Sequence, residues 1–192
     1  MRIIAGLAKG VRLKAPKGTN TRPTSDRVRE SVFAILGDFS GCRILDLFAG
    51  SGALGLEALS RGAAVALFLE KDRAAVQVIQ ENIEKTRLAS QARVLAVDVL
   101  KFLANPGRYW SKLSEQNYDL VFVDPPYAAG LYETVLVKLV FSGLLADHSI
   151  VVVESAKFQL PSKVEGFNLW RSERYGDTVV HFYRFAVTKE SQ

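Results

Sequence analysis

Arg43-Ile44-Leu45-Asp46-Leu47-Phe48-Ala49-Gly50-Ser51-Gly52-Ala53-Leu54-Gly55 is the stretch that decides the fold of this 192-residue chain. An apolar run ends at an acid, closely spaced glycines follow, and the pattern then continues as a helix through residues 56–59. This order predicts a strand, a tight turn and the start of a helix. Glycine lets the backbone approach a ligand closely, and the first N–H groups of a helix have no intrahelical partner. We therefore expect a nucleotide-like ligand at this turn.

Strands and helices alternate along the rest of the chain. Short, uniformly apolar runs predict strands at residues 65–69, 93–97, 119–123 and 149–153. Patterns with one apolar face predict helices at residues 25–39, 72–87 and 131–141, with a short helix that ends near residue 103. Two further strands, 168–174 and 178–187, are expected to close the chain as an antiparallel hairpin. The alternation predicts an α/β fold with a mostly parallel, seven-stranded sheet and helices on both faces.

The N-terminus is expected to form a small basic arm. Residues 2–15 have the apolar and glycine pattern of a β-hairpin, and residues 16–23 form a connector that contains two prolines. We place the boundary between this arm (residues 1–23) and the main domain (residues 24–192) there. Residues 1–30 hold eight Lys or Arg against two acids, although the whole chain has a net charge of only +5. This concentration favours a surface that binds a polyanion, and a solubilising tail is the alternative.

Composition narrows the class of protein. The chain is 48% hydrophobic and 23% charged, and its apolar runs are too short to span a bilayer. A signal-peptide pattern is also absent from the sequence, so we expect a cytoplasmic protein without a membrane partner. The single cysteine, Cys42, excludes an internal disulfide, and two histidines offer no zinc cluster.

Acids recur where the predicted parallel strands end. They are Asp46, Glu70, Asp98 and Asp124. Ligands of open α/β sheets bind outside the carboxyl ends of the strands. The four acids therefore describe a single cleft, which also contains the glycine turn.

The glycine turn alone leaves the ligand open. Residues 50–55 satisfy the pattern G-x-G-x-x-G, and Glu70 follows Gly50 by 20 residues, as a ribose-binding acid does in dinucleotide-binding folds. An NAD-dependent oxidoreductase is therefore one interpretation. A purely structural use of the glycines, to pack the helix against the strand, is another.

The tetrapeptide Asp124-Pro125-Pro126-Tyr127 favours methyl transfer to a planar amine. Such an amine must pyramidalise to attack a methyl group, and hydrogen-bond acceptors beside its N–H groups favour that change. The Asp124 carboxylate and the Pro125 carbonyl are two such acceptors, held in place because proline fixes φ. Tyr127 can stack on a nucleobase. The structural alternative is a proline turn with a packed tyrosine.

With these motifs the chain resembles class I S-adenosylmethionine-dependent methyltransferases, and more narrowly the RsmD family of bacterial 16S rRNA guanine-N2 methyltransferases. The resemblance rests on residues 46–52 and 124–127 and, more specifically, on Arg2-Ile3-Ile4-Ala5-Gly6 and the segment 21–33. It implies a Rossmann-like methyltransferase fold and an enzyme that acts on 16S rRNA. The sequence does not indicate the oligomeric state, and we expect a monomer. The rRNA is expected within the small ribosomal subunit or an assembly intermediate.

The resemblance also implies roles for individual residues. S-adenosylmethionine, with S-adenosylhomocysteine as product and no metal, would be bound by Asp46, Phe48, Ala49, Gly50, Ser51, Gly52, Glu70, Lys71, Asp98 and Val99. The acceptor base would lie at Asp124, Pro125, Pro126 and Tyr127. RNA phosphates would be held by Lys9, Arg12, Lys14, Arg22 and Arg27.

Three other functions stay open at this point. The same tetrapeptide serves an adenine-N6 methyltransferase acting on DNA or RNA, the glycine pattern serves an oxidoreductase, and the basic arm serves a non-catalytic RNA-binding or assembly factor. The sequence leaves open which nucleotide is modified, and whether naked RNA or an assembled particle is the substrate. It assigns no role to His148, Glu154, Tyr175 or Asp177.

Overall fold

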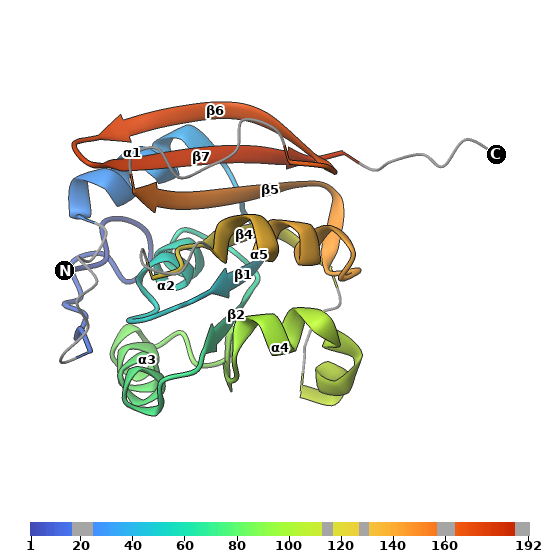
Figure 1. Ribbon diagram of the computed structural model, residues 1–192. Helices are drawn as coiled ribbons and strands as arrows, with labels where there is room; N and C mark the ends of the chain where they lie inside the picture. Colours follow the sequence, from blue (N-terminus) through green and yellow to red (C-terminus); the bar gives the residue numbers. More distant parts are fainter. Residues whose placement is uncertain (17–24, 113–116, 127–130, 157–163, 187–192) are drawn as a thin grey trace.

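A seven-stranded sheet forms the centre of the computed structural model, which describes residues 1–16, 25–112, 117–126, 131–156 and 164–186 (Figure 1). The strands lie in the order β3-β2-β1-β4-β5-β7-β6. Their bounds are β1 Arg43–Leu47, β2 Val65–Glu70, β3 Ala92–Ala96, β4 Tyr118–Val123, β5 Leu145–Ala156, β6 Phe167–Tyr175 and β7 Thr178–Phe185. Strands β1 to β5 pair in parallel, and β7 pairs antiparallel with both β5 and β6. The predicted fold class is confirmed.

Helices cover both faces of the sheet. Their bounds are α1 Asp26–Leu36, α2 Ala53–Ser60, α3 Arg73–Thr86, α4 Val99–Ala104 and α5 Leu131–Val140, with a 3₁₀ helix η1 at Pro106–Lys112. The apolar sides of α1, α2 and α3 pack in one core cluster, and those of α4 and α5 pack in a second cluster on the opposite face. Helices α2, α3, α4 and α5 each lie between two consecutive parallel strands and return the chain to the edge of the sheet where the next strand begins. Such strand–helix–strand connections are almost always right-handed.

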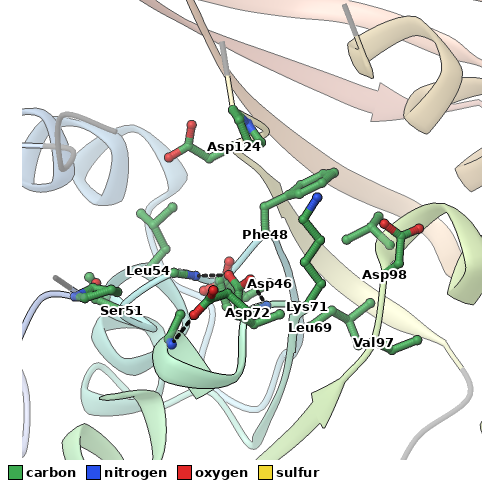
Figure 2. A pocket seen from close by; sticks show the side chains of 18 of the residues that line it. Asp46, Phe48, Ser51, Leu54, Leu69, Lys71, Asp72, Val97, Asp98 and Asp124 are labelled. Atoms are coloured by element: carbon green, nitrogen blue, oxygen red, sulfur yellow. Dashed lines mark hydrogen bonds between the residues drawn. The ribbon is translucent and has the colours of Figure 1, made fainter. Parts of the chain in front are cut away.

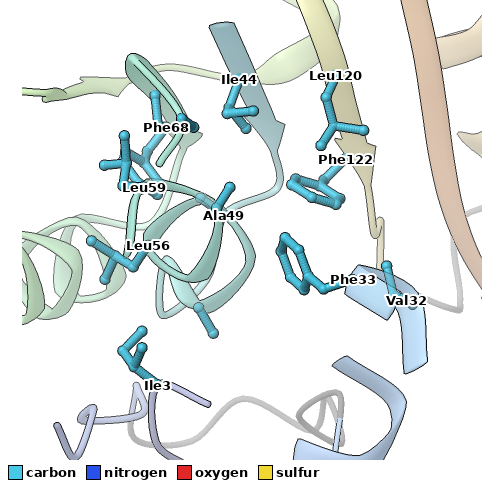
Figure 3. Close-up of a cluster of buried hydrophobic side chains, with 14 of the residues drawn as sticks. Ile3, Val32, Phe33, Ile44, Ala49, Leu56, Leu59, Phe68, Leu120 and Phe122 are labelled. Carbon is cyan, nitrogen blue, oxygen red and sulfur yellow. The ribbon is translucent and has the colours of Figure 1, made fainter. Parts of the chain in front are cut away.

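The core between the sheet and helices α1 to α3 is built from large side chains that alternate along each strand. Ile44 of β1 and Phe68 of β2 point to this face, together with Phe122 of β4, and all three are fully buried. Phe33 of α1 packs against Phe122 with ring centroids 5.8 Å apart (Figure 3). This packing fixes α1 on the sheet and so places its first turn beside the carboxyl edge of the strands.

Strand β5 is longer than the predicted run of residues 149–153. It extends from Leu145 to Ala156 because it pairs with β4 on one side and along seven positions with β7 on the other. The terminal hairpin is confirmed, and its second strand, β7, inserts between β5 and β6. Beyond Val153, the polar residues near the end of β5 pair with β7 on one side, and on the other side they lie beyond the end of β4.

The N-terminal segment reverses direction as predicted, but it contains a single antiparallel bridge, between Arg2 and Arg12. Other backbone N–H groups of the segment are used to dock it on α2. The buried Glu57 carboxylate accepts bonds from the N–H groups of Ile4 (2.7 Å) and Ala5 (3.0 Å). Residue 6 must be glycine here, because a Cβ would lie 1.7 Å from the Ser60 carbonyl oxygen.

Residues 1–16 are packed on the main domain. Ile3, Ala8 and Leu13 are buried and belong to the same core cluster as α1 and α2. The predicted boundary at residue 23 falls outside the described residues. No helix in the described ranges has the length and apolarity to cross a membrane.

Candidate functional site

The four acids at the strand ends line one cavity of about 430 Å³. Asp46 belongs to β1 and Glu70 ends β2, while Asp98 and Asp124 follow β3 and β4. The cavity lies where the strand order reverses between β1 and β4, which is the position at which open α/β sheets bind ligands. Figure 2 shows Asp46 at the floor of this cavity, with Asp98 and Asp124 on different walls. The cleft predicted from the sequence is therefore present.

The glycine turn after β1 is shaped by left-handed backbone. Phe48, Gly50 and Gly52 have φ values of 63°, 56° and 75°, which glycine adopts at little cost and which phenylalanine rarely adopts. The Ala49 N–H donates to the Leu69 carbonyl at 2.9 Å, which ties the turn to the end of β2. Gly52 is the N-cap residue of α2, without a capping side chain. The turn thus presents backbone to the cavity.

The first and last glycines of the G-x-G-x-x-G pattern, Gly50 and Gly55, differ in what surrounds them. A Cβ on Gly50 would meet only the Phe48 carbonyl oxygen, at 3.9 Å, and Gly50 lines the cavity. A Cβ on Gly55 would lie 2.4 Å from the Phe68 ring, so this glycine allows α2 to pack on β2. The ligand-related and the structural interpretation of the glycines therefore apply at different positions.

Asp46 is a buried carboxyl with an elevated proton affinity. Only 2% of its side chain is exposed, and its Oδ2 accepts a bond from the Gly55 N–H at 3.0 Å. Burial raises the pKa of Asp46 to about 7, with a smaller contribution from the charge of Glu70, although the Gly55 bond opposes the shift. A cationic group bound beside Asp46 would favour its ionised form.

Backbone donors orient two further acids of the cavity, Glu70 and Asp98. Oε2 of Glu70 accepts from the Gly50 N–H at 3.0 Å, and Oε1 accepts from the Asp72 N–H at 2.9 Å. Asp98 is the N-cap residue of α4 and accepts from the Lys101 N–H at 3.1 Å. Both side chains are thereby fixed before any ligand binds, and each retains further acceptor capacity.

Asp124 lies directly after β4 at the mouth of the cavity. Burial raises the pKa of its carboxyl well above the ordinary value, and the charges of Glu154 and Asp46 raise it further. Pro125 is buried beneath this position, whereas Pro126 is exposed and lines the cavity. Tyr127 falls outside the described residues, so its predicted stacking role stays a prediction.

Most of the residues predicted to bind a cofactor do meet at this cavity. Those that line it are Asp46, Phe48, Ala49, Gly50, Ser51, Glu70, Lys71, Asp98 and Val99. Gly52 is buried behind the turn, where a Cβ would approach Ile79 and Phe68. Its position thus suits it to shape the turn rather than to line the cavity.

The predicted RNA-binding cations divide into two groups. Lys9, Arg12 and Arg27 are exposed, whereas the Lys14 ammonium pairs with the Glu81 carboxylate of α3. Arg22 falls outside the described residues. The backbone of Lys14 is also held in place, because its N–H donates to the Asn82 Oδ1 at 2.8 Å.

Arg29 is a cavity residue that the sequence patterns do not reveal. It is one of the eight basic residues of the N-terminal region, yet its side chain is only 1% exposed and it lines the cavity. Its Nη2 donates to Asp26 Oδ1 at 2.9 Å and to the Arg2 carbonyl. Burial lowers its pKa, and Asp26 and then Glu57 oppose that shift. The i, i+3 spacing of Asp26 and Arg29 indicates an ion pair on one helix face, but it does not indicate that the arginine is buried.

The carboxyl groups at the glycine turn suit a ligand that carries a cationic group. Asp46 and Glu70 place two carboxyl groups at the glycine turn, and Glu70 already occupies the Gly50 N–H. Anions bind at helix N-termini through free N–H groups, so a pyrophosphate at this turn would face two carboxyl groups instead.

Comparison with known proteins relates the whole chain to one family. The family model described as Conserved hypothetical protein 95 matches residues 1–184. Ribosomal RNA small subunit methyltransferase D of Escherichia coli K12 is 39% identical over 193 residues, covering 100% of this chain and 93% of that protein. YlbH of Bacillus subtilis is 38% identical, with 96% and 98% covered. The solved structure of yhhF from Escherichia coli superposes with a TM-score of 0.80 at 38% identity and covers 96% of this chain and 97% of that one.

Proposed function

The chain belongs to the family described as Conserved hypothetical protein 95, the RsmD family, and on that premise we propose that it transfers a methyl group from S-adenosylmethionine to the exocyclic N2 of a guanine in 16S rRNA. One observation carries the proposal: Asp124 and the acids Asp46, Glu70 and Asp98 line a single cavity beside the glycine turn. The name of the Escherichia coli relative supports small-subunit rRNA as the substrate. We expect the enzyme to act as a monomer in the cytoplasm, on the small subunit or its assembly intermediate.

The residues that line the cavity fit the proposed cofactor. Asp46 suits the cationic methionine portion because its carboxyl is buried at the floor, and Glu70, fixed by two backbone donors, suits the ribose hydroxyls. Asp98 and Val99 at the start of α4 would contact the adenine. When bound, S-adenosylmethionine supplies a methyl group on a positively charged sulfur. Acids around the cavity stabilise that charge in the bound state.

The acceptor end of the cavity is formed by Asp124 and the prolines after it. The Asp124 carboxylate accepts a hydrogen bond from the guanine amine, and this interaction strengthens as the nitrogen gains positive charge during attack. Pro125 and Pro126 restrict the backbone, so the acceptors are held in place before the base arrives. Most of the rate enhancement is expected from alignment, for which orientation supplies roughly 7 to 11 kcal/mol.

The N-terminal segment provides the surface for RNA. Lys9 and Arg12 are exposed on a segment whose backbone is fixed to α2, and Arg27 is exposed on α1. Such cations hold phosphates without reading the sequence of the RNA. The target guanine must leave its stack to reach Asp124, and Tyr127 is proposed to stack on it.

The decisive experiment follows labelled methyl from S-adenosylmethionine into undermethylated small subunits and maps the modified nucleoside. We expect N2-methylguanosine from the wild-type protein. Asp124→Ala should abolish transfer while cofactor affinity stays near that of the wild type. N6-methyladenosine would replace the proposal by the adenine-N6 alternative, and binding of NAD without binding of S-adenosylmethionine would replace it by an oxidoreductase.

A further inference from the structure

Glu154 is a buried carboxyl that lies beside Asp124 at the end of the neighbouring strand. In the parallel pairing of β4 with β5, Val123 is opposite Val153, so Asp124 and Glu154 are the next residues of their strands. The Glu154 side chain is only 7% exposed. Asp124 and Glu154 therefore form a pair of adjacent carboxyl residues at the acceptor end of the cavity.

The two carboxyl residues border the same small, apolar space. This space has a volume of about 10 Å³ and lies between β4, β5 and α1. Its remaining wall is apolar, formed by Val32, Leu54, Phe122, Val123, Val152 and Val180. Charges interact more strongly in such an environment than in water, so each carboxyl senses the protonation state of the other.

Several titratable or charged side chains lie on the elements around this pair. They are Asp46 on β1, Arg29 on α1, and Glu173 and Tyr175 on β6. Glu173 is occupied by a 2.8 Å ion pair with Arg171, and Arg29 is bonded to Asp26. Strand β7 places Val180 opposite Glu154. After burial, the charge of Glu154 is the larger of the two charge effects that raise the pKa of the Asp124 carboxyl, and that of Asp46 is the smaller.

We propose that Glu154 acts through Asp124 in the methyl transfer, as the second carboxyl of a pair that takes up the proton released by the guanine amine. This role rests on the proposed function. The N2 lone pair forms the new C–N bond as the methyl–sulfur bond breaks, and its electron pair stays on sulfur. The nitrogen then carries one proton too many, and that proton passes to the Asp124 carboxylate. Glu154 shares it until solvent removes it.

A second carboxyl makes Asp124 a stronger base. A lone aspartate is a weak acceptor, because its ordinary pKa near 4 lies far below neutral pH. A neighbouring carboxylate favours the protonated form, and two such groups titrate as a pair rather than independently. Glu154 is a positioning residue in this scheme, since Asp124 and not Glu154 meets the base.

The test compares pH–rate profiles of methyl transfer to small subunits. In the wild type we expect the rate to fall on the acid side, where Asp124 is protonated. Glu154→Gln keeps the shape of the side chain but removes its charge, so the acid limb should move to lower pH. The plateau at high pH should fall several-fold because the acceptor is weaker. The two profiles should therefore cross.

Matched variants separate this role from structural damage. Ser155→Ala changes the next buried residue of β5, whose Oγ makes only a 3.5 Å contact with the Val179 carbonyl, and it should leave the acid limb in place. Glu154→Asp retains a carboxyl and should restore the limb toward the wild-type position. An unchanged acid limb in Glu154→Gln would overturn the inference. A wild type that transfers no methyl group would instead overturn the proposed function.

A measurement on the free protein makes the inference independent of turnover. The side-chain carboxyl carbon of Asp124 can be titrated by NMR in the wild type and in Glu154→Gln. The inference requires a lower titration midpoint for Asp124 in the variant than in the wild type. Equal midpoints in a folded variant would refute it even if the enzyme were active.

Discussion

Glu70 accepts a hydrogen bond from the backbone N–H of Gly50 at 3.0 Å, which joins the end of β2 to the glycine turn after β1. Its other carboxylate oxygen accepts from the Asp72 N–H at 2.9 Å. The residue that is proposed to bind the ribose hydroxyls is therefore held by two backbone donors on separate segments. Removing it would disturb both ligand binding and the position of the turn.

Glu70→Ala should weaken S-adenosylmethionine binding strongly. Hydrogen bonds to a charged group contribute about 1.5 to 3 kcal/mol each, so the loss of even one should raise the dissociation constant at least about 10-fold. Isothermal titration calorimetry on the free protein measures this directly. Glu84→Ala, at an exposed position of α3, is the control and should leave the affinity unchanged. A change below threefold in Glu70→Ala would rule out the ribose role.

The buried Asp46 should make stability depend on pH. Its pKa of about 7 lies above that of the unfolded chain, so the folded state binds the extra proton at intermediate pH. Stability from this group is complete below about pH 4 and is lost as the pH rises to about 7. Asp46→Asn keeps an oxygen for the Gly55 N–H but removes the charge.

We therefore expect the wild type to lose about 2 to 3 kcal/mol of unfolding free energy relative to Asp46→Asn between pH 5 and pH 7. Urea unfolding of both proteins at several pH values provides the comparison. Parallel curves for the two proteins would show that Asp46 has an ordinary pKa. The variant should also bind S-adenosylmethionine more weakly above pH 7, since it lacks the carboxylate for a cation.

Gly50 and Gly55 should respond differently to substitution by alanine. Gly55→Ala places a methyl group 2.4 Å from the Phe68 ring, and such overpacking costs about 1 to 3 kcal/mol of stability. Gly50→Ala has space for its Cβ but a φ of 56°, so the expected cost is backbone strain of about 1 kcal/mol and weaker cofactor binding. Unfolding and calorimetry on both variants distinguish these outcomes. Equal losses of affinity in the two would contradict the division of roles.

Much of the fold follows from local patterns in the sequence. Uniformly apolar strands that alternate with one-sided helices require a parallel sheet covered on both faces, and every strand predicted after residue 42 is present. The position of β7 between β5 and β6 depends on long-range pairing, for which a strand pattern contains no signal. The N-terminal segment also differs from a regular hairpin because Glu57 satisfies two of its N–H groups.

The site was predictable where its residues lie at strand ends and not where they act through packing. Asp46, Glu70, Asp98 and Asp124 could be grouped because parallel strands end at the same edge. The burial of Arg29 and Glu154 depends on what other elements place over them. Charge patterning along the chain suggests a surface position for Arg29. The pattern contains no signal that the Arg29 guanidinium donates a hydrogen bond to the Arg2 carbonyl.

The cations proposed to bind RNA should contribute unequally to the salt dependence of RNA binding. Lys9 and Arg12 are exposed, and each is expected to neutralise one phosphate. Substituting either by alanine should therefore reduce the salt dependence of binding, log Kd against log salt, by roughly 0.7 to 0.9. Lys14→Ala should change the slope less, because Glu81 already neutralises its ammonium.

Filter binding of 16S rRNA fragments at several salt concentrations measures these slopes, with Lys101→Ala on α4 as the control on the opposite face of the sheet. Glu81→Gln provides the sharper test, since it frees the Lys14 ammonium for a phosphate. It should therefore steepen the salt dependence, and Lys14→Ala in that background should reverse the change. If Lys101→Ala lowers the slope as much as Lys9→Ala, RNA binding is not localised on the N-terminal segment.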